Sequence, residues 1–218
     1  KIEQIVPEDV FLETEESDPE NLFENYTAGL FDYSGYDETI NRIIDGILHQ
    51  RKCLVSYYSV YERVNKNFYV EPRRIVYFRG GLYVIIYIRR FEKFRLLAIQ
   101  RIKHFEVLEE VHPDEPRFDP ALFWKNKFGL FSADSCHVKI EFSTSARMHI
   151  EGRHWHPSQV FSEGKKGSLI LEMDVGLSPE LTSWIFSWNE YAKVLEPPEL
   201  IEKISKKIDK LRKLYPTT

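Results

Sequence analysis

The strongest constraint on the fold is an alternating pattern of side chains between Gly80 and Arg90. Successive side chains of a β-strand point to opposite faces of the sheet. One face of this strand is apolar throughout, and the other combines phenol groups with a guanidinium group. The apolar face carries Leu82, Val84, Ile86 and Ile88, and the mixed face carries Tyr83, Ile85, Tyr87 and Arg89. We expect a strand that builds a core with one side and offers an anion- or base-binding surface with the other.

Basic residues concentrate around this strand. Between Arg73 and Lys103 the sequence has nine Lys or Arg residues and a single acid. Residues 1–38 hold twelve acids and one base, residues 39–111 hold fourteen bases and seven acids, and residues 112–218 hold fifteen of each. This asymmetry favours a partner rich in phosphate or another anion. The alternative is a basic sheet face that is simply solvated.

Length and composition favour a cytoplasmic globular protein of one large or two small domains. The 218 residues are 43% hydrophobic and include fifteen Phe, enough to build real cores. No apolar run approaches the ~20 residues that span a bilayer, and the acidic N-terminal region lacks a signal-peptide pattern. Cys53 and Cys136 lie far apart without CxxC spacing. They are typical of buried thiols in a reducing compartment.

The first half of the chain predicts an irregular leader, one helix and five strands. We expect residues 1–38 to dock partly through their aromatic residues, which are Phe11, Phe23, Tyr26, Phe31, Tyr33 and Tyr36. A helix over about residues 39–50, capped by Asp37 or Thr39, has one apolar face. The predicted strands are Cys53–Tyr61, Asn67–Phe78 with Pro72 at an edge or bulge, Gly81–Arg90, Phe94–Gln100 and Ile102–Glu109. Residues 39–111 therefore predict a small SH3-like or Sm-like β-barrel.

The second half predicts a connector and a separate domain. Residues 112–134 are punctuated by prolines and contain an aromatic cluster. Residues 135–218 predict the order β-α-β-β-α-β-α, which is close to a ferredoxin-like pattern. Ser178 and Pro179 are the residue types of a helix N-cap and first helical position. The predicted elements are His137–Phe142, Thr144–Arg153, Gln159–Phe161, Ser168–Val175, Ser178–Trp188, Tyr191–Leu195 and Pro197–Tyr215. The fold class is thus mixed α+β, a small barrel followed by a ferredoxin-like domain.

Two ordered series of short motifs resemble those of a known family. The first series is Val55-Ser56-Tyr57-Tyr58, Tyr69-Val70-Glu71-Pro72-Arg73, Gly81-Leu82-Tyr83-Val84 and Leu97-Ala98-Ile99-Gln100-Arg101-Ile102. The second is Arg153-His154-Trp155-His156-Pro157-Ser158-Gln159, Gly167-Ser168-Leu169, Trp184-Ile185-Phe186-Ser187-Trp188 and Val194-Leu195-Glu196-Pro197. They resemble a WYL domain over residues 39–111 and, over residues 118–215, the C-terminal extension that commonly follows it. Leu82 and Val84 stand where the family has Trp and Leu, and Gln100 and Asn189 replace an acid and a Gly.

The resemblance implies a role in transcription. WYL proteins are mostly bacterial transcription factors with an N-terminal winged helix-turn-helix. Their barrel is thought to sense a ligand, in some members a nucleic acid, and the extension helps them form homodimers. Residues 1–38 are too acidic and too poor in helical periodicity to enter a DNA groove. Either a DNA-binding domain precedes Lys1 and alone binds duplex DNA, or this chain is the effector module by itself.

The candidate ligand-binding residues lie on the predicted barrel strands. Arg101 comes first because it matches the family's motif arginine, and its alternative role is a salt bridge with Glu71 or Glu106. Tyr83 and Tyr87 could stack with a base, or could pack in the core with their hydroxyls at its rim. Guanidinium groups suit bidentate phosphate or carboxylate recognition, and we expect several to open onto one hollow. The full set is Arg101, Tyr83, Tyr87, Arg89, Arg95, Arg74 and Tyr57.

Sequence patterns for catalysis, metals and cofactors are missing. His149, His154 and His156 have no nearby acid or cysteine to complete a metal site. Nucleophile-elbow, paired-carboxylate and phosphate-loop patterns do not occur, so we expect neither an enzyme nor a cofactor. The last helix has a short seam, formed by Ile201, Ile204, Ile208, Leu211 and Tyr215. It predicts either a dimer contact or a helix packed on its own sheet.

Two functional hypotheses of different class follow. The first is the effector-sensing and dimerisation module of a transcriptional regulator, which binds an anionic ligand such as single-stranded nucleic acid or a nucleotide. The second is an interaction adaptor whose basic barrel docks a protein partner or its own acidic leader.

Overall fold

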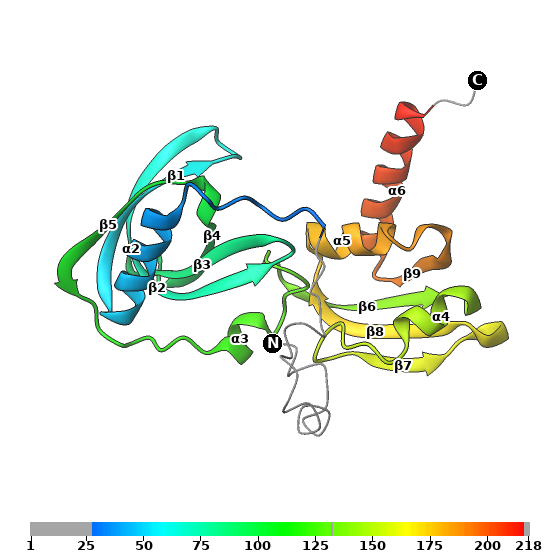
Figure 1. Cartoon of the computed structure of the whole chain (residues 1–218). Helices are drawn as coiled ribbons and strands as arrows, with labels where there is room; N and C mark the ends of the chain where they lie inside the picture. Colours follow the sequence, from blue (N-terminus) through cyan, green and yellow to red (C-terminus); the bar gives the residue numbers. More distant parts are fainter. Residues whose placement is uncertain (1–27, 132, 216–218) are drawn as a thin grey trace, which may run out of the picture. The chain divides into compact units, whose positions relative to one another are not determined.

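The computed structural model describes residues 28–131 and 133–215 (Figure 1). The described chain is mixed α+β and has two antiparallel sheets, in two compact units that divide between Pro116 and Arg117. Among these residues, no helix combines the length and apolar character needed to cross a bilayer. Three aromatic residues of the predicted leader, Phe11, Phe23 and Tyr26, lie outside the described ranges.

The first unit is a five-stranded antiparallel sheet with one helix. The elements are α2 (Asp37–Leu48), β1 (Arg51–Ser59), β2 (Val64–Phe78), β3 (Gly81–Ile88), β4 (Lys93–Ala98) and β5 (Ile102–Val111), with 3-10 turns η3 (Arg89–Phe91) and η4 (Ile99–Arg101). The strand order is β4-β3-β2-β1-β5, so the last strand returns beside the first. Strands β4 and β5 form the two edges and do not pair with each other. The sheet is therefore open within the described residues, and no closed barrel is found among them, so the predicted SH3-like or Sm-like barrel is not confirmed.

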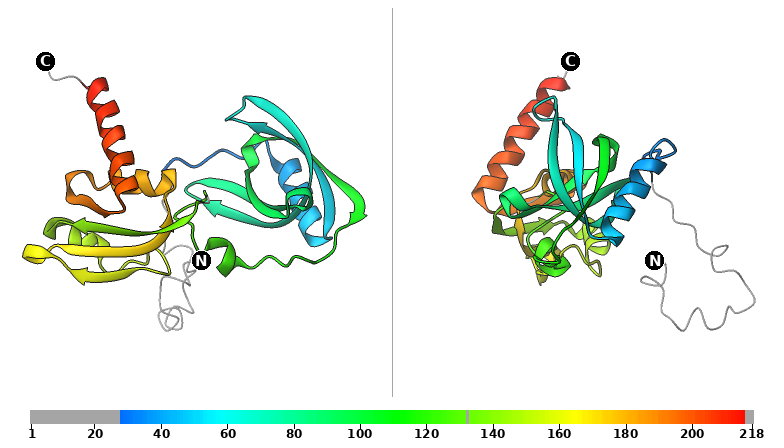
Figure 2. Two further views of the ribbon diagram at one scale, coloured as in Figure 1. Left: turned by 180° about the vertical axis from the view of Figure 1, so that it is seen from behind. Right: turned by 90° about the vertical axis from the view of Figure 1, so that its left-hand side faces the viewer.

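Helix α2 lies across the curved sheet, against β1, β2 and β5 (Figure 2). Ile43 is fully buried on its apolar face. A Cβ atom at Gly46 would lie 2.8 Å from Cys53 Sγ, so the glycine permits the close approach of helix and sheet. The predicted caps were wrong: Asp37 is already the first helical residue, and the residue before it makes no side-chain cap. Asp37 instead stabilises the first turn through the helix dipole.

Strand β2 bends at a bulge, as Pro72 predicted. The register with β3 shifts between Pro72, which pairs with Ile86, and Arg74, which pairs with Ile85. Arg73 is therefore the extra residue of β2, and its side chain is only 9% exposed. A proline has no N–H to donate to a ladder, so an interruption of pairing is favoured at this position.

Both faces of β3 are buried in the middle of the strand. Ile85 is fully buried and Tyr87 nearly so, although alternation had placed them on the face offered to ligands. Only the two ends of that face, Tyr83 and Arg89, reach the surface. Burial also raises the pKa of the Cys53 thiol to about 12, in agreement with the predicted buried cysteine, whereas Cys136 is half-buried.

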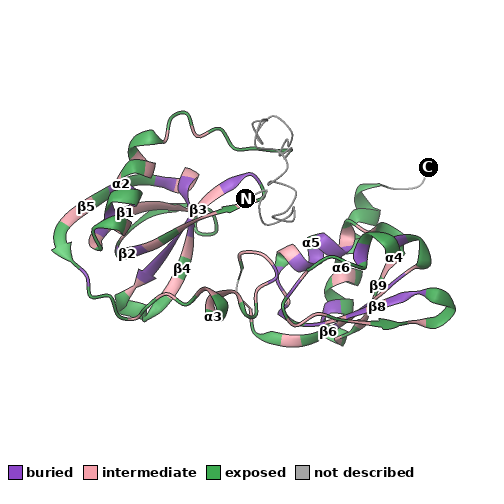
Figure 3. Ribbon diagram, turned by 60° about the horizontal axis from the view of Figure 1, so that its bottom comes forward, coloured by how far each residue is buried: buried purple, intermediate pink, exposed green. Residues whose placement is uncertain are grey.

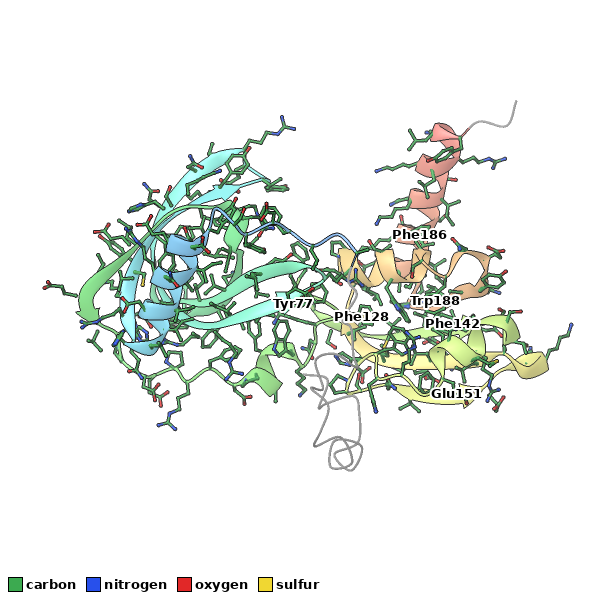
Figure 4. The ribbon with its side chains drawn as sticks, in the orientation of Figure 1. Tyr77, Phe128, Phe142, Glu151, Phe186 and Trp188 are labelled. Carbon is green, nitrogen blue, oxygen red and sulfur yellow. The ribbon has the colours of Figure 1, made fainter. Side chains whose placement is uncertain are left out.

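The second unit is a four-stranded antiparallel sheet of order β7-β8-β6-β9. Its elements are α3 (Pro120–Trp124), β6 (Ser135–Phe142), α4 (Thr144–Ile150), β7 (Val160–Glu163), β8 (Leu169–Gly176), α5 (Pro179–Phe186), β9 (Ala192–Glu196) and α6 (Pro198–Leu214). Buried residues gather in β6, β8 and α5 (Figure 3). Phe128, Phe142 and Trp188 meet in this core (Figure 4). The predicted Ser178 cap is confirmed, since its Oγ accepts from Leu181 N at 3.1 Å and donates to Phe128 O at 3.0 Å.

Helix α6 is packed on its own sheet only at its beginning. Leu200 is fully buried and Ile204 is partly buried against the core of this unit. Further along, the helix extends beyond the sheet (Figure 1). The other members of its predicted seam are exposed: Ile201, Ile208, Leu211 and Tyr215.

Candidate ligand-binding site

A pocket of about 1210 Å³ opens in the first unit. Strands β1 and β2, the end of β3, turn η3 and the end of β5 form its walls. Its lining combines basic groups with aromatic rings, and the residues that matter most for its chemistry are Lys52, Lys66, Tyr69, Glu71, Tyr87, Arg89, Arg90, Phe91 and His112. Two of the predicted ligand-binding residues, Tyr87 and Arg89, therefore line one cavity.

A buried carboxylate stands at the centre of this site. Glu71 is 4% exposed, and both of its oxygens accept from arginines. Arg89 donates from Nε to Oε1 at 2.7 Å and from Nη2 to Oε2 at 2.9 Å. Arg73 donates from Nη2 to Oε2, also at 2.9 Å. A buried charge needs such partners, because leaving it unpaired costs several kcal/mol.

The neighbouring histidine contacts both Arg73 and Pro113. His112 is buried, and its Nδ1 lies 2.9 Å from Pro113 O and 3.0 Å from Arg73 Nη1; a ring proton on Nδ1 would be donated to Pro113 O. Nε2 is then free to accept from Arg73 Nη1 at 2.7 Å. Burial lowers the pKa of His112, and the charge of Arg73 lowers it further. The cluster of Glu71, Arg73, Arg89 and His112 is called the Glu71 cluster below.

The Glu71 cluster has a surplus positive charge. Two guanidinium groups surround one carboxylate, and the histidine adds no charge while it is neutral. Arg73 is almost fully buried, whereas the side chain of Arg89 is 50% exposed and lines the pocket. Arg73 Nε is buried without a hydrogen-bond partner among the described residues. The guanidinium groups of Arg89 and Arg90 are thus both accessible to an anion in the pocket.

Aromatic rings accompany these charges. Tyr87 packs against Phe94 with ring centroids 5.0 Å apart, and the Arg89 guanidinium carbon lies 5.5 Å from the Tyr87 ring centre. Tyr69 and Phe91 are exposed where they line the pocket. An exposed ring beside a basic group is the arrangement on which nucleobases stack in single-strand-binding proteins.

The titration of His112 predicts a loss of stability in acid. Because its folded-state pKa lies below the ordinary value of 6.5, the unfolded state binds more protons below that pH. The free energy of unfolding should then fall as the pH decreases below 6.5, by at most about 1.4 kcal/mol per pH unit from this group. Urea unfolding followed by far-UV circular dichroism should give a shallower acid slope for His112→Gln. An unchanged slope would contradict this prediction, and exposed His104→Gln is the control.

The first-choice residue, Arg101, lies elsewhere. Its guanidinium carbon is 5.2 Å from the ring centre of Tyr57, and the Tyr57 hydroxyl accepts from Ala98 N at 3.2 Å. Tyr83 pairs with Ala98 at this end of β3. No salt bridge joins Arg101 to Glu71 or Glu106 in the described part of the chain. Arg101, Tyr57 and Tyr83 form a second cluster, separate from the pocket.

A segment of the predicted leader lies beside this second cluster. The Tyr33 hydroxyl accepts from Leu82 N at 2.6 Å and donates to Gln100 Oε1 at 3.2 Å. Phe31, Tyr33 and Tyr36 contact one another through their rings. At the hairpin turn, Phe31 N donates to Gly80 O at 3.0 Å. Residues 28–36 thus dock through aromatic side chains, as predicted for the described part of the leader.

The predicted convergence of the arginines on one hollow is wrong. Arg95 pairs with Ile86 across the β3–β4 ladder, so it shares the face of Ile86 and not that of Tyr87. Arg74 is exposed and pairs with Ile85, beyond the bulge. Only Arg89 of the predicted arginines reaches the pocket.

Sequence reasoning missed the centre of the site, which is Glu71 with Arg73 and His112. The available signal was the acid-proline-arginine sequence at residues 71–73, because a bulge at the proline can turn the next side chain inward. In the described ranges no group of His, Cys, Asp and Glu could hold a metal ion. His149 and His154 are exposed, whereas His156 is buried, with its Nδ1 2.7 Å from Ser158 Oγ.

Fold and site together define a two-unit α+β protein with a basic, aromatic-lined pocket in its first unit. Residues 38–107 match the WYL domain, and residues 134–212 match the WCX domain. The chain belongs to the WYL-domain family, as its motifs indicated. No curated protein matches it.

Two solved structures resemble the chain. One is proteasome accessory factor B/C (PafBC) of Arthrobacter aurescens, with 18% identity, a TM-score of 0.40, and coverage of 88% of this chain and 29% of that one. The other is a CRISPR Cas-related protein, with 12% identity, a TM-score of 0.57, and coverage of 83% of this chain and 52% of that one. The second likeness supports the fold alone. The chain spans about a third and about half of the lengths of these proteins.

Proposed function

We propose that this chain is the effector-sensing module of a bacterial transcriptional regulator. The pairing of a WYL domain with a WCX domain supports this class. We further propose that the pocket beside the Glu71 cluster binds an anionic ligand that carries a planar ring, such as a nucleotide or single-stranded nucleic acid. The observation that carries the proposal is the half-exposed Arg89 in a pocket rimmed by Tyr69 and Phe91.

The charges of the pocket favour an anion over a neutral ligand. Glu71 is paired with both Arg73 and Arg89, and Arg89 and Arg90 are exposed where they line the pocket. Lys52 has Glu110 as a partner at 2.9 Å, whereas Arg90 contacts the ring of Phe91 and no carboxylate of the described residues. Phosphate or carboxylate oxygens would give Arg89 and Arg90 charge-assisted hydrogen bonds, which contribute about 1.5–3 kcal/mol each.

The domain and fold assignments extend this proposal. We propose a leader over residues 1–38, a WYL domain over residues 39–111, a connector over residues 112–134 and an extension domain over residues 135–218. The order β4-β3-β2-β1-β5 supports an SH3-like or Sm-like topology for the first unit, and the order β7-β8-β6-β9 supports a ferredoxin-like second unit. The exposed seam of α6 supports a homodimer contact through the second unit.

Binding of a labelled oligonucleotide tests the ligand class. Fluorescence anisotropy with fluorescein-labelled oligothymidylate should give saturable binding to the full chain that weakens as salt rises. Arg89→Gln should reduce affinity by about 10-fold to 100-fold, because one bidentate guanidinium is lost. Arg101→Gln is the matched control, since its guanidinium lies at Tyr57 and outside the pocket.

The pattern across these variants decides the site. A loss with Arg101→Gln and none with Arg89→Gln would move the ligand to the second cluster. Unchanged affinity in both would reject an arginine-based site on this unit. Duplex of the same sequence is expected to bind more weakly than the single strand, because stacking on Tyr69 and Phe91 requires unpaired bases.

The adaptor hypothesis remains the second candidate. The docking of Phe31, Tyr33 and Tyr36 beside Gln100 and Leu82 favours a leader that binds its own sheet. In the same titration, deletion of residues 1–38 should raise affinity if the acidic leader competes with the oligonucleotide. An unchanged affinity would mean that the leader does not compete with the oligonucleotide.

A further inference from the structure

One guanidinium group joins the pocket to the start of the connector. Arg89 uses Nε and Nη2 to hold Glu71, and Nη2 also donates to the backbone oxygen of Glu115 at 3.0 Å. Glu115 lies just before the division between the two units at Pro116. The same side chain therefore contacts the pocket, the buried carboxylate and the segment that leads to the second unit.

The beginning of this segment is held by the same cluster. His112 N donates to Gln50 O at 2.9 Å, which ties the segment to the turn between α2 and β1. The His112 ring accepts from Arg73, whose Nη2 donates to Glu71. Residues 112–115 are thus fastened through two arginines that share one carboxylate.

The geometry of Arg89 determines what a ligand would displace. A guanidinium group has five N–H donors in one plane, and a bidentate anion takes two parallel donors along one edge. The Nε–Nη2 edge is occupied by Glu71. The remaining edge uses Nη1 together with the second hydrogen of Nη2, which is the hydrogen donated to Glu115 O.

An anion on this second edge would leave the buried ion pair intact. Glu71 would keep its bonds to Arg89 and Arg73, so no buried charge would lose its partner. The bond that must be given up is the one to Glu115 O, which is formed by exposed groups. Charge-assisted bonds to an anion are stronger than a bond to a neutral carbonyl, so the exchange is favourable.

We propose that Arg89 is a latch: an anion bound in the pocket takes its Nη1–Nη2 edge, displaces Glu115 O and loosens residues 112–116. This inference rests on the proposed function and adds its regulation. Ligand binding in the pocket thereby loosens the segment that leads into the second unit. Arg89 acts on that segment as a positioning residue in addition to its contact with the ligand.

Hydrogen exchange of the connector peptide tests the latch. Exchange of backbone amides is measured by mass spectrometry on the full chain, with and without saturating oligothymidylate. We expect wild-type residues 112–118 to exchange about tenfold faster when the pocket is filled, as expected from the loss of one charge-assisted hydrogen bond. In Arg89→Gln the same peptide should exchange faster without ligand and should not respond to it.

Arg90→Gln is the matched control, because Arg90 lines the same pocket but contacts neither Glu71 nor Glu115. It should bind more weakly, yet its connector should be protected without ligand and should respond at saturation.

Anisotropy measured in parallel separates the two proposals. Binding by the wild type with unchanged connector exchange would overturn the latch alone, whereas no binding at any concentration would remove the pocket as a ligand site and the latch with it. Equal exchange of the ligand-free Arg89→Gln and Arg90→Gln proteins would also overturn the latch.

Discussion

Glu71→Ala is expected to lower the free energy of unfolding of the first unit by about 3–5 kcal/mol. The substitution removes the carboxylate that compensates two guanidinium groups, one of which, Arg73, is almost fully enclosed. Arg73 would then be a buried charge that keeps its contact with the ring of His112 but has lost its ion pair with Glu71. Removing one member of a buried ion pair is costly for this reason, even where the pair itself adds little net stability.

The composition of the chain allows the two units to be followed separately. All four tryptophans lie after Arg117, so tryptophan emission in urea monitors the second unit, and far-UV circular dichroism monitors both. The matched control is Glu110→Ala, whose carboxylate is 62% exposed in its pair with Lys52 and should contribute less than about 1 kcal/mol. Equal effects of the two substitutions would mean that the Glu71 cluster does not hold the first unit together.

Trp184→Ala should destabilise the second unit by about 3–5 kcal/mol. Trp184 is 6% exposed, and its ring lies 4.9 Å from Trp155 and 5.0 Å from Phe128, measured between centroids. Truncation leaves a cavity among the rings of Phe128, Phe142 and Trp155, and such a site cannot collapse easily. The transition seen by tryptophan emission should move to lower urea, and the signal of the first unit should not change.

Two companion substitutions sharpen this result. Trp184→Phe should cost less, because it keeps much of the ring and removes an indole N–H that has no partner among the described residues. Met148→Ala on the exposed side of α4 should change stability by less than about 0.5 kcal/mol. A loss with Trp184→Ala as small as that with Met148→Ala would contradict the central place of Trp184 in this core.

The helices and strands were predictable because each follows a local pattern. The alternation around Val84 and the 3.6-residue spacing around Ile43 depend only on which residues face a core. Pro72 predicted its bulge, and Ser178 predicted its cap, because both act through the backbone of their own segment. The cap predicted at Asp37 was wrong because several neighbouring residues are of suitable cap types, so the sequence leaves the helix boundary uncertain by a residue or two.

The site was harder to predict because it depends on register. A shift of one residue moves a side chain to the other face of a sheet, and the bulge introduces such a shift at Arg73. Arg95 pairs with Ile86 because of the length of the turn between β3 and β4. The sequence did not determine that length to better than several residues. Charge counts found the correct region, but they could not distinguish Arg89 in the pocket from Arg101 beside Tyr57.

The crossing of residues 28–36 over the hairpin turn depends on the absence of a single carbon atom. Gly80 has a φ of +81°, and a methyl group at its Cα would lie 2.6 Å from the carbonyl oxygen of Gly29. Residues 28–36 therefore pass directly against the backbone of Gly80, and the Tyr33 hydroxyl holds them through its hydrogen bond with Leu82 N. A family member with a side chain at the position of Gly80 would have to place this N-terminal segment along a different path. The residue at that position therefore indicates whether a relative shares this arrangement.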